Sequence, residues 1–314
     1  MSEAEIHSKM IKAEALRLGF SACGISKVQE LKKEAKKLKD WLSKGNNAEM
    51  NYMQNHFEKR INPKKLVPNS KSVISVILNY FPGEIPYKKG EARISKYALG
   101  RDYHKVMKKK LKELYLFINN EIQNIDGRFF SDSAPVMDKA WAEKSGLGWR
   151  GKNGNIINKK IGSFFFIGEL IIDLELKEDT AINEACGSCT ACIEACPTNA
   201  LHIPYKLDAN LCISYQTIEN KNPIPENIIE NIEDNIFGCD ICQDVCPWNK
   251  KAPLTKIKDF ASRLDLLNLQ YTDYLAMNKK EFDTIFNGTP IKRAGYNKIQ
   301  QTVKQIVSYQ KQKQ

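Results

Sequence analysis

Eight of the nine cysteines lie between residues 186 and 246, in two runs that each end in Cys-Pro and at one position between the runs. They are Cys186, Cys189, Cys192, Cys196, Cys212, Cys239, Cys242 and Cys246. In the bacterial C-x2-C-x2-C-x3-C-P arrangement, three closely spaced cysteines hold one [4Fe–4S] cluster and the fourth binds the neighbouring cluster. The pattern therefore predicts two [4Fe–4S] clusters whose ligands cross between the runs.

The crossed pattern assigns four cysteines to each cluster. The first cluster is held by Cys186, Cys189, Cys192 and Cys246. The second cluster is held by Cys196, Cys212, Cys239 and Cys242. Because each run supplies a ligand to the cluster of the other run, the two halves are expected to form one ferredoxin-like unit.

Zinc binding and disulfide formation are the two alternative uses of these cysteines. Zinc sites usually combine two Cys-x2-Cys pairs that lie far apart, whereas here four cysteines fall between Cys186 and Cys196 and are followed by Pro197. Disulfides belong to oxidising compartments, and no secretory segment is evident. The ninth cysteine, Cys23, is expected to be a small buried side chain near an apolar segment.

Composition indicates a soluble chain with two or three structural units. The 314 residues are 42% hydrophobic and 27% charged, which is enough to bury more than one core. No apolar run reaches the roughly 18 residues that span a bilayer, and the first ten residues lack an apolar signal core, so a cytoplasmic location is expected. The net charge of +11 favours a polyanionic partner, although lysine-rich solvated helices give the same excess.

Apolar periodicity predicts the elements of an α+β fold. Helical spacing is found over residues 6–19, 31–42 and 107–122, and the β-branched run over 73–80 is typical of a buried strand. Residues 155–176 are expected to form two strands, joined at 159–162, as a hairpin on the core sheet. Later helices are expected over 265–275 and 279–286.

These elements suggest three parts. A mixed α/β domain covers 1–178, a ferredoxin-like two-cluster domain covers 179–250, and a short helical segment covers 251–314. An acidic stretch at 176–183 marks the first boundary, and the tail from residue 300 has too few apolar residues to form a domain of its own.

A second informative segment runs from Ser131 to Pro135 and leads into a glycine-rich loop. On local sequence alone, Asp132 or Ser133 caps a helix that has Pro135 in its first turn and ends at Gly146. The glycines that follow would let the backbone approach a large planar or anionic ligand, or simply turn.

Six segments resemble the epoxyqueuosine reductase family, and the match of which they are part extends over nearly the whole chain. They are RISKYALGRDYH (93–104), DSAP (132–135), AEKSGLGWRGKN (142–153), CISY (212–215), CPWN (246–249) and GTPIKRAGY (288–296). The resemblance implies a cytoplasmic, monomeric enzyme that uses cobalamin and two [4Fe–4S] clusters. Its implied reaction is the last step of queuosine synthesis, the reduction of the epoxide of the wobble nucleoside in tRNA to an alkene, with electrons from an external low-potential donor.

The resemblance also implies site residues in the N-terminal domain, which becomes a corrin-binding domain. Asp132 is implied as the acid that protonates the epoxide oxygen, and burial would have to raise its pKa for this. The implied cofactor contacts are Arg60, Tyr97, Asp132, Gly151, Lys152, Asn153, Ile156 and Ser214. Surface charge is the alternative for Arg60 and Lys152, and core packing is the alternative for Tyr97 and Ile156.

Two other function classes remain open on the residues alone. A corrinoid iron–sulfur reductase of a small molecule, similar to reductive dehalogenases, is disfavoured by the basic charge and by the lack of a twin-arginine signal. A pure electron carrier does not need the N-terminal domain. Many family members continue past Tyr296 into HEAT-like repeats that help to hold tRNA, so here tRNA contacts are expected elsewhere, including Lys292 and Arg293.

Overall fold

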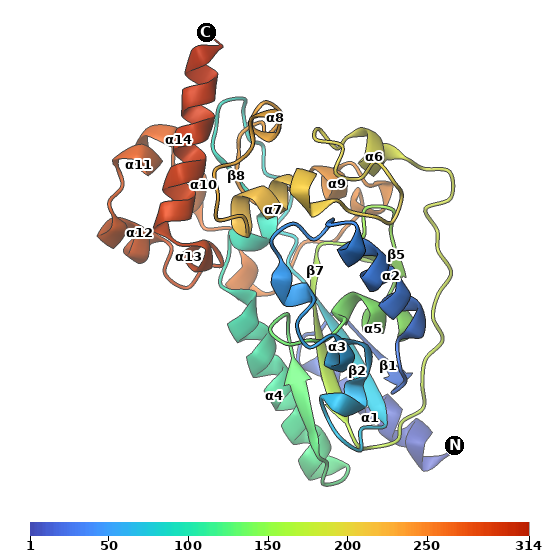
Figure 1. Ribbon diagram of the computed structural model, residues 1–314. Coiled ribbons are helices and arrows are strands. Elements are labelled where there is room, and N and C mark those ends of the chain that lie inside the picture. The colour runs from blue at the N-terminus through green and yellow to red at the C-terminus, as the bar shows by residue number, and fades with distance from the viewer. Residues whose placement is uncertain (314) are drawn as a thin grey trace.

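The computed structural model describes residues 1–313, which are built around an antiparallel four-stranded sheet (Figure 1). Its strand order is β1 (Ala22–Lys27), β2 (Ser72–Asn79), β7 (Phe165–Ile172) and β4 (Gly127–Phe130). Every residue of β2 is buried, as expected for a β-branched strand in the middle of a sheet. The sequence prediction of a buried strand over 73–80 is therefore confirmed.

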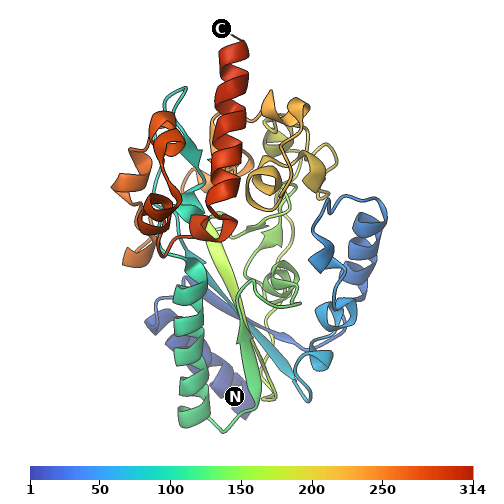
Figure 2. The same cartoon turned by 60° about the vertical axis from the view of Figure 1, so that its left-hand side comes forward.

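Helices cover both faces of this sheet (Figure 2). One face carries α1 (Glu3–Arg17) and α4 (Tyr103–Glu121), which bury a large apolar core against β2 and β7. The other face carries α5 (Asp138–Lys144), with α2 (Lys32–Ser43) and α3 (Phe57–Ile61) beside it. The helices predicted over 6–19, 31–42 and 107–122 are confirmed as α1, α2 and α4. The residues whose spacing predicted the first helix do not form its buried face, because Ile6, Met10 and Leu16 are exposed and α1 packs through Ile11 and Ala15.

The cysteine-rich part and the C-terminal helices share a second core. It includes β3 (Arg93–Ile94), which pairs in parallel with β8 (Asn235–Phe237), although 93–94 belong to the N-terminal half of the sequence. The other elements of this half are α6 (Ala191–Glu194), α7 (Ile213–Ile218), α8 (Glu226–Ile229), α9 (Ile241–Asp244), α10 (Leu264–Leu267), α11 (Tyr271–Ala276), α12 (Lys279–Ile285), α13 (Ile291–Ala294) and α14 (Tyr296–Gln312).

Short 3₁₀ helices connect several of these elements. They are η1 (Asn51–Met53), η2 (Pro63–Lys65), η3 (Lys96–Ala98), η4 (Ala209–Leu211), η5 (Pro247–Asn249) and η6 (Lys258–Phe260). Within residues 1–313, none of the helices has both the length and the apolar character needed to cross a bilayer.

Three sequence predictions about local structure need correction. The hairpin expected over 155–176 is right at its turn, which Asn158 and Gly162 close as an antiparallel bridge. Its strand pairing is wrong, because β6 (Ile156–Ile157) pairs with β5 (Trp149–Arg150), while β7 pairs with β2 and β4. The helix expected over 265–275 is divided into α10 and α11. As predicted, the C-terminal tail forms no domain of its own, since α14 packs into the second core through residues such as Ile299 and Val303.

The third correction concerns the start of α5. This helix begins at Asp138, after Met137, and Met137 makes no side-chain cap, so neither Asp132 nor Ser133 caps it. Its predicted end is right, because Gly146 follows the helix with a φ of 72°. Asp132 is thereby left free of the structural role that local sequence favoured.

Candidate functional site

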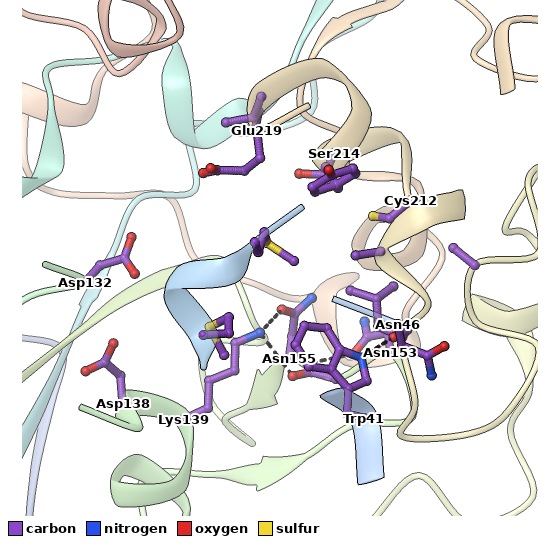
Figure 3. Close-up of a pocket in the computed structure, with 18 of the residues that line it drawn as sticks. Trp41, Asn46, Asp132, Asp138, Lys139, Asn153, Asn155, Cys212, Ser214 and Glu219 are labelled. Carbon is purple, nitrogen blue, oxygen red and sulfur yellow. Dashed lines mark hydrogen bonds between the residues drawn. The ribbon is translucent and has the colours of Figure 1, made fainter. Parts of the chain in front are cut away.

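A cavity of about 1960 Å³ lies where the four-stranded sheet with its helices (the sheet domain), the cysteine-rich part (residues 186–246) and the start of α14 meet. Pockets for ordinary small ligands are roughly 300–1,000 Å³, so this cavity has room for a large planar cofactor together with a substrate group. Five residues expected to contact the cofactor line it: Arg60, Tyr97, Asp132, Asn153 and Ser214. Figure 3 shows Asp132 on one side of the cavity and Cys212 with Ser214 on the other.

The thiols predicted for the first cluster lie together. Burial raises the pKa of the Cys192 thiol, and the nearby thiol of Cys246 raises it further, as do those of Cys186 and Cys189. Cys246 and Cys186 also belong to one small apolar cluster, although they are far apart in the sequence. The fold therefore brings the last cysteine of the second run to the three leading cysteines of the first run.

The thiols predicted for the second cluster also lie together. Burial raises the pKa of Cys242, and the Cys212 thiol adds to this rise. Burial raises the pKa of the Cys239 thiol, and the thiols of Cys242 and Cys212 raise it further. The Cys196 thiol likewise raises the pKa of Cys212. All four of these cysteines line the cavity. The donor set and its grouping fit two four-cysteine clusters, the second of which would border the cavity.

Two further observations concern a possible site for a single metal ion and the ninth cysteine. Within residues 1–313, no three His, Cys, Asp or Glu side chains are arranged to hold one metal ion. Cys23 lies on β1 against the core of the sheet domain, where burial raises the pKa of its thiol to about 12. It packs as the sequence predicted.

The glycine-rich loop links the two cysteine runs. Lys152 donates from Nζ to the carbonyl oxygens of Gly187 (2.6 Å) and Cys189 (2.9 Å). Its neighbour Asn153 donates from Nδ2 to the carbonyl oxygen of Cys242 at 3.2 Å. This loop therefore fixes the first cysteine run with one side chain and the second run with the next.

Asp132 stands in the loop after β4 with a φ of 52°, a left-handed conformation that Asp and Asn tolerate better than most residues. Its Oδ2 accepts a hydrogen bond of 2.5 Å from the Tyr103 hydroxyl and lies 3.9 Å from Nε2 of His104. The side chain is 65% exposed, so the burial that the sequence argument required of this acid is not found.

A chain of polar contacts supports the Tyr103 side of the site. The Tyr103 ring stacks on His104 with centroids 4.0 Å apart. Nη1 of Arg293 lies 2.6 Å from Nε2 of His104, and Nδ1 of His104 lies 2.7 Å from Oδ1 of Asp102. A histidine with its hydrogen on Nδ1 satisfies both neighbours, since Arg293 can only donate. Arg293 is thus built into the cavity wall.

A second group of charged residues, Arg60, Asp138 and Lys139, lines the same cavity as Asp132. Arg60 donates to the carbonyl oxygen of Tyr52 at 3.0 Å, while its buried Nε has no partner among the described residues. Lys139 donates from Nζ to Asn155 at 3.0 Å (Figure 3). Its side chain is reached from the cavity, but the surrounding protein withdraws it from bulk water and lowers its pKa to about 8. Asp138 precedes it and also faces the cavity.

Three of the expected cofactor contacts do not line the cavity. Ile156 packs in the core beneath α5, and Lys152 is engaged with the cysteine run, next to Gly151. Sequence reasoning assigned no role to Tyr103, His104, Asp138 and Lys139, which do line it. It expected Arg293 to contact tRNA, whereas Arg293 is part of the cavity wall. The signal for Tyr103, His104 and Arg293 was present, because they fall inside segments that carry the family resemblance, whereas Asp138 and Lys139 looked like ordinary helix residues.

Comparison with protein families matches both halves of the chain. Residues 60–133 match the family described as epoxyqueuosine reductase QueG, DUF1730, and residues 185–249 match the 4Fe-4S double cluster binding domain. The epoxyqueuosine reductase of Cellulophaga algicola is 50% identical over 96% of this chain and 99% of its own length. That of Escherichia coli is 40% identical over 92% of this chain and 77% of its own length.

Solved structures agree with this match. An epoxyqueuosine reductase with a tRNA-Tyr epoxyqueuosine-modified tRNA stem loop has a TM-score of 0.90 and 27% identity, and the match covers 96% of this chain and 80% of that one. The Bacillus subtilis enzyme, with its catalytic loop swung out of the active site, has a TM-score of 0.89 and 27% identity, over 96% of this chain and 81% of that one. From sequence and structure together, this chain belongs to the epoxyqueuosine reductase family and is an oxidoreductase.

Proposed function

We propose that this chain reduces epoxyqueuosine to queuosine at the wobble position of tRNA, with two [4Fe–4S] clusters and cobalamin as cofactors. The observation that carries the proposal is that one large cavity is bordered both by Asp132 and by the four cysteines of the second cluster. An acid and an electron source therefore face the same space, which is what a reductive removal of oxygen requires.

The overall reaction needs two electrons and two protons, because the epoxide oxygen leaves as water and an alkene remains. The clusters and cobalamin would supply the electrons and the reactive metal, as cofactors do in redox enzymes. The protein supplies proton transfer and positioning. The cofactor and the substrate nucleoside, when they fill the cavity, would supply the burial that Asp132 lacks in the open cavity, and Asp132 would then give its proton to the epoxide oxygen. The Tyr103 hydroxyl, 2.5 Å from Oδ2, holds the carboxyl group in place.

Residues of the cavity wall fit a large cofactor with polar edges. Arg60 and Asn153 offer side-chain donors, Ser214 offers a hydroxyl, and Tyr97 offers an aromatic face. The unpartnered Nε of Arg60 is a buried donor for which a bound polar group would provide the missing acceptor. Ser214 follows the cluster ligand Cys212 by two positions, so a cofactor at Ser214 would lie close to the second cluster.

A tRNA partner is supported by two observations. A solved family member of the same fold was determined with an epoxyqueuosine-modified tRNA stem loop. The chain also carries a net charge of +11, which suits a phosphate backbone. We further propose that the enzyme acts as a cytoplasmic monomer and receives electrons from an external low-potential donor.

Complementation tests this function in cells. A bacterial strain that lacks its own epoxyqueuosine reductase accumulates epoxyqueuosine in its tRNA, and expression of this chain should restore queuosine. The Asp132→Asn variant, expressed to the same level, should not restore it. Persistent epoxyqueuosine in cells that contain the cluster-loaded wild-type protein would favour a corrinoid reductase of a small molecule instead.

A further inference from the structure

The strand β7 carries an acidic side chain inside an otherwise apolar layer. Glu169 is 0% exposed, and neither of its carboxyl oxygens receives a hydrogen bond from any N–H or O–H donor among residues 1–313. In the sheet register it stands opposite Ser75 of β2 and Phe130 of β4. An ionised carboxylate in such a place would be strongly disfavoured, because burial without partners removes its hydration.

The group that reaches Glu169 is the carboxyl of Asp138, the first residue of α5. The two side chains are close enough to hydrogen-bond to each other. Asp138 also faces the cavity, so it joins the enclosed Glu169 to the reaction space (Figure 3). Two carboxyl groups can form a hydrogen bond only when one of them carries a proton.

Tight packing encloses the pair on the sheet side. The end of α5 lies so close to the sheet that a Cβ on Gly24 would stand 2.1 Å from the carbonyl oxygen of Ser145. Apolar residues flank Glu169 on the same face, among them Ile77, Trp141 and Ile171. Glu169 itself is 0% exposed, and the cavity reaches the pair at Asp138.

Electrostatics favour one proton on the pair at neutral pH. Burial raises the pKa of Asp138 to about 7, and that of Glu169 rises well above its ordinary value for the same reason. The charged groups that face Asp138 are Arg60 and Lys139, which favour its ionised form, and Asp132, which opposes it. Two adjacent carboxylates cannot both ionise easily, and their protons belong to the pair as a unit.

We propose that Asp138 and Glu169 share one proton and that this pair reprotonates Asp132 between the two proton transfers of the reaction. The proposal rests on the proposed function. After Asp132 has given its proton to the epoxide oxygen, the O–H bond of the pair breaks at Asp138 and a new O–H bond forms on Asp132. Asp132 then protonates the same oxygen again, which leaves as water. No electrons move in the step, and a hydronium ion from the solvent, arriving through water in the cavity, restores the proton of the pair as it is lost.

Infrared spectroscopy on the full-length, cluster-loaded and cobalamin-loaded protein tests the shared proton without any substrate. The wild-type protein should show the C=O band of a protonated carboxyl group at pH 7. Glu169→Gln should lose this band, because Asp138 then has no acidic partner. Asp138→Asn should keep a shifted band, since Glu169 stays buried and protonated. Glu175→Gln, at an exposed position after β7, is the matched control and should keep the wild-type band.

Turnover on epoxyqueuosine-containing tRNA stem loop tests the relay. Both Glu169→Gln and Asp138→Asn should lower kcat, within the roughly 10²–10⁴-fold range of acid–base contributions, while KM and cofactor content stay unchanged. The wild-type kcat should fall as the pH rises through about 7, and this fall should be absent in Glu169→Gln.

Two results would overturn the proposal. A missing carboxyl band in the wild-type protein at pH 7, or an unchanged band in Glu169→Gln, refutes the shared proton. Wild-type kcat with a wild-type pH profile in Glu169→Gln assigns the pair a structural role only. If no variant and no wild-type protein turns over the tRNA, the proposed function and the relay fail together, and the infrared result still decides whether the proton is shared.

Discussion

The hydroxyl of Tyr103 donates a 2.5 Å hydrogen bond to Oδ2 of Asp132. Tyr103 is the first residue of α4, and Asp132 follows β4, so this bond joins a helix on one face of the sheet to a loop at the edge of the cavity. Its ring is fixed between His104 and Phe166, with centroid distances of 4.0 and 4.1 Å. A rigid donor thus orients an acid whose own backbone has a left-handed φ.

Asp132→Asn should abolish turnover without disturbing the cofactors. Asparagine tolerates the φ of 52° and can still accept the hydrogen bond from Tyr103, but it has no acidic proton. Turnover should fall by roughly 10²–10⁴-fold, the range of general-acid contributions. Cobalamin binding and iron content, measured by absorption and metal analysis, should match the wild type. Near wild-type turnover would return Asp132 to a structural role.

The crossing of cluster ligands predicts a distant effect of Cys246. Cys246→Ala should damage the cluster held by Cys186, Cys189 and Cys192, because its thiol lies beside theirs. Electron paramagnetic resonance and iron analysis of the anaerobically reconstituted protein, which should hold eight irons in the wild type by the two-cluster ligand count, measure this. Cys23→Ser is the matched control and should leave both clusters intact. Loss confined to the Cys239 and Cys242 cluster would refute the crossing.

The raised pKa values of the buried carboxyl pair predict a pH-dependent stability. A pKa that is higher in the folded than in the unfolded state contributes stability at low pH, which is lost as the pH rises through the folded value. For Asp138 this window runs from its ordinary value of 3.8 to about 7, and Glu169 extends it upward. Relative to Glu169→Gln, the wild-type protein should therefore lose thermal stability as the pH rises from about 4 through about 7 and above. If the unfolding midpoints of the wild type and Glu169→Gln change with pH in the same way across this range, the raised pKa values of the pair are contradicted.

Binding of tRNA should weaken steeply with salt. Each phosphate neutralised contributes a log–log slope of roughly 0.7–0.9. Lys292 is the better probe, because its side chain is 42% exposed, whereas Arg293 is engaged with His104 in the cavity wall. Lys292→Glu should weaken binding of the stem loop and flatten its salt dependence, with cofactor content unchanged. Lys108→Glu, on the exposed side of α4, is the control. If Lys292→Glu binds like the control, this surface does not contact tRNA.

Periodicity and motif spacing predicted different parts of the protein. The strand β2 and the helix α4 follow directly from apolar spacing, because each buries one continuous set of side chains. The helix α2 was also predicted, although Leu38 is its one buried residue. The turn at 159–162 was predictable, but the pairing of β6 with β5 was not, because the choice of partner strand depends on tertiary packing and is not encoded locally. The cysteine grouping stays a prediction from the ligand number and order that cluster chemistry requires, and the fold places the thiols of each group near one another.

The carboxyl pair shows what sequence reasoning could not find. Glu169 is visible as a single acidic interruption in the apolar strand FFIGELII, but its partner Asp138 lies on a helix whose approach to the sheet is set by tertiary packing. The 65% exposure of Asp132 was equally hidden, because it depends on how the loop after β4 meets the cavity.

The most direct test of the central claim is the product of the reaction itself. The reduced, cluster-loaded and cobalamin-loaded enzyme is incubated with epoxyqueuosine-containing tRNA, and the nucleosides are analysed by mass spectrometry after digestion. The account predicts that the modified nucleoside loses the mass of one oxygen atom, and that omission of cobalamin or the Asp132→Asn substitution prevents this loss. An unchanged epoxyqueuosine signal, with clusters and cobalamin shown to be reduced in the same sample, would contradict the account.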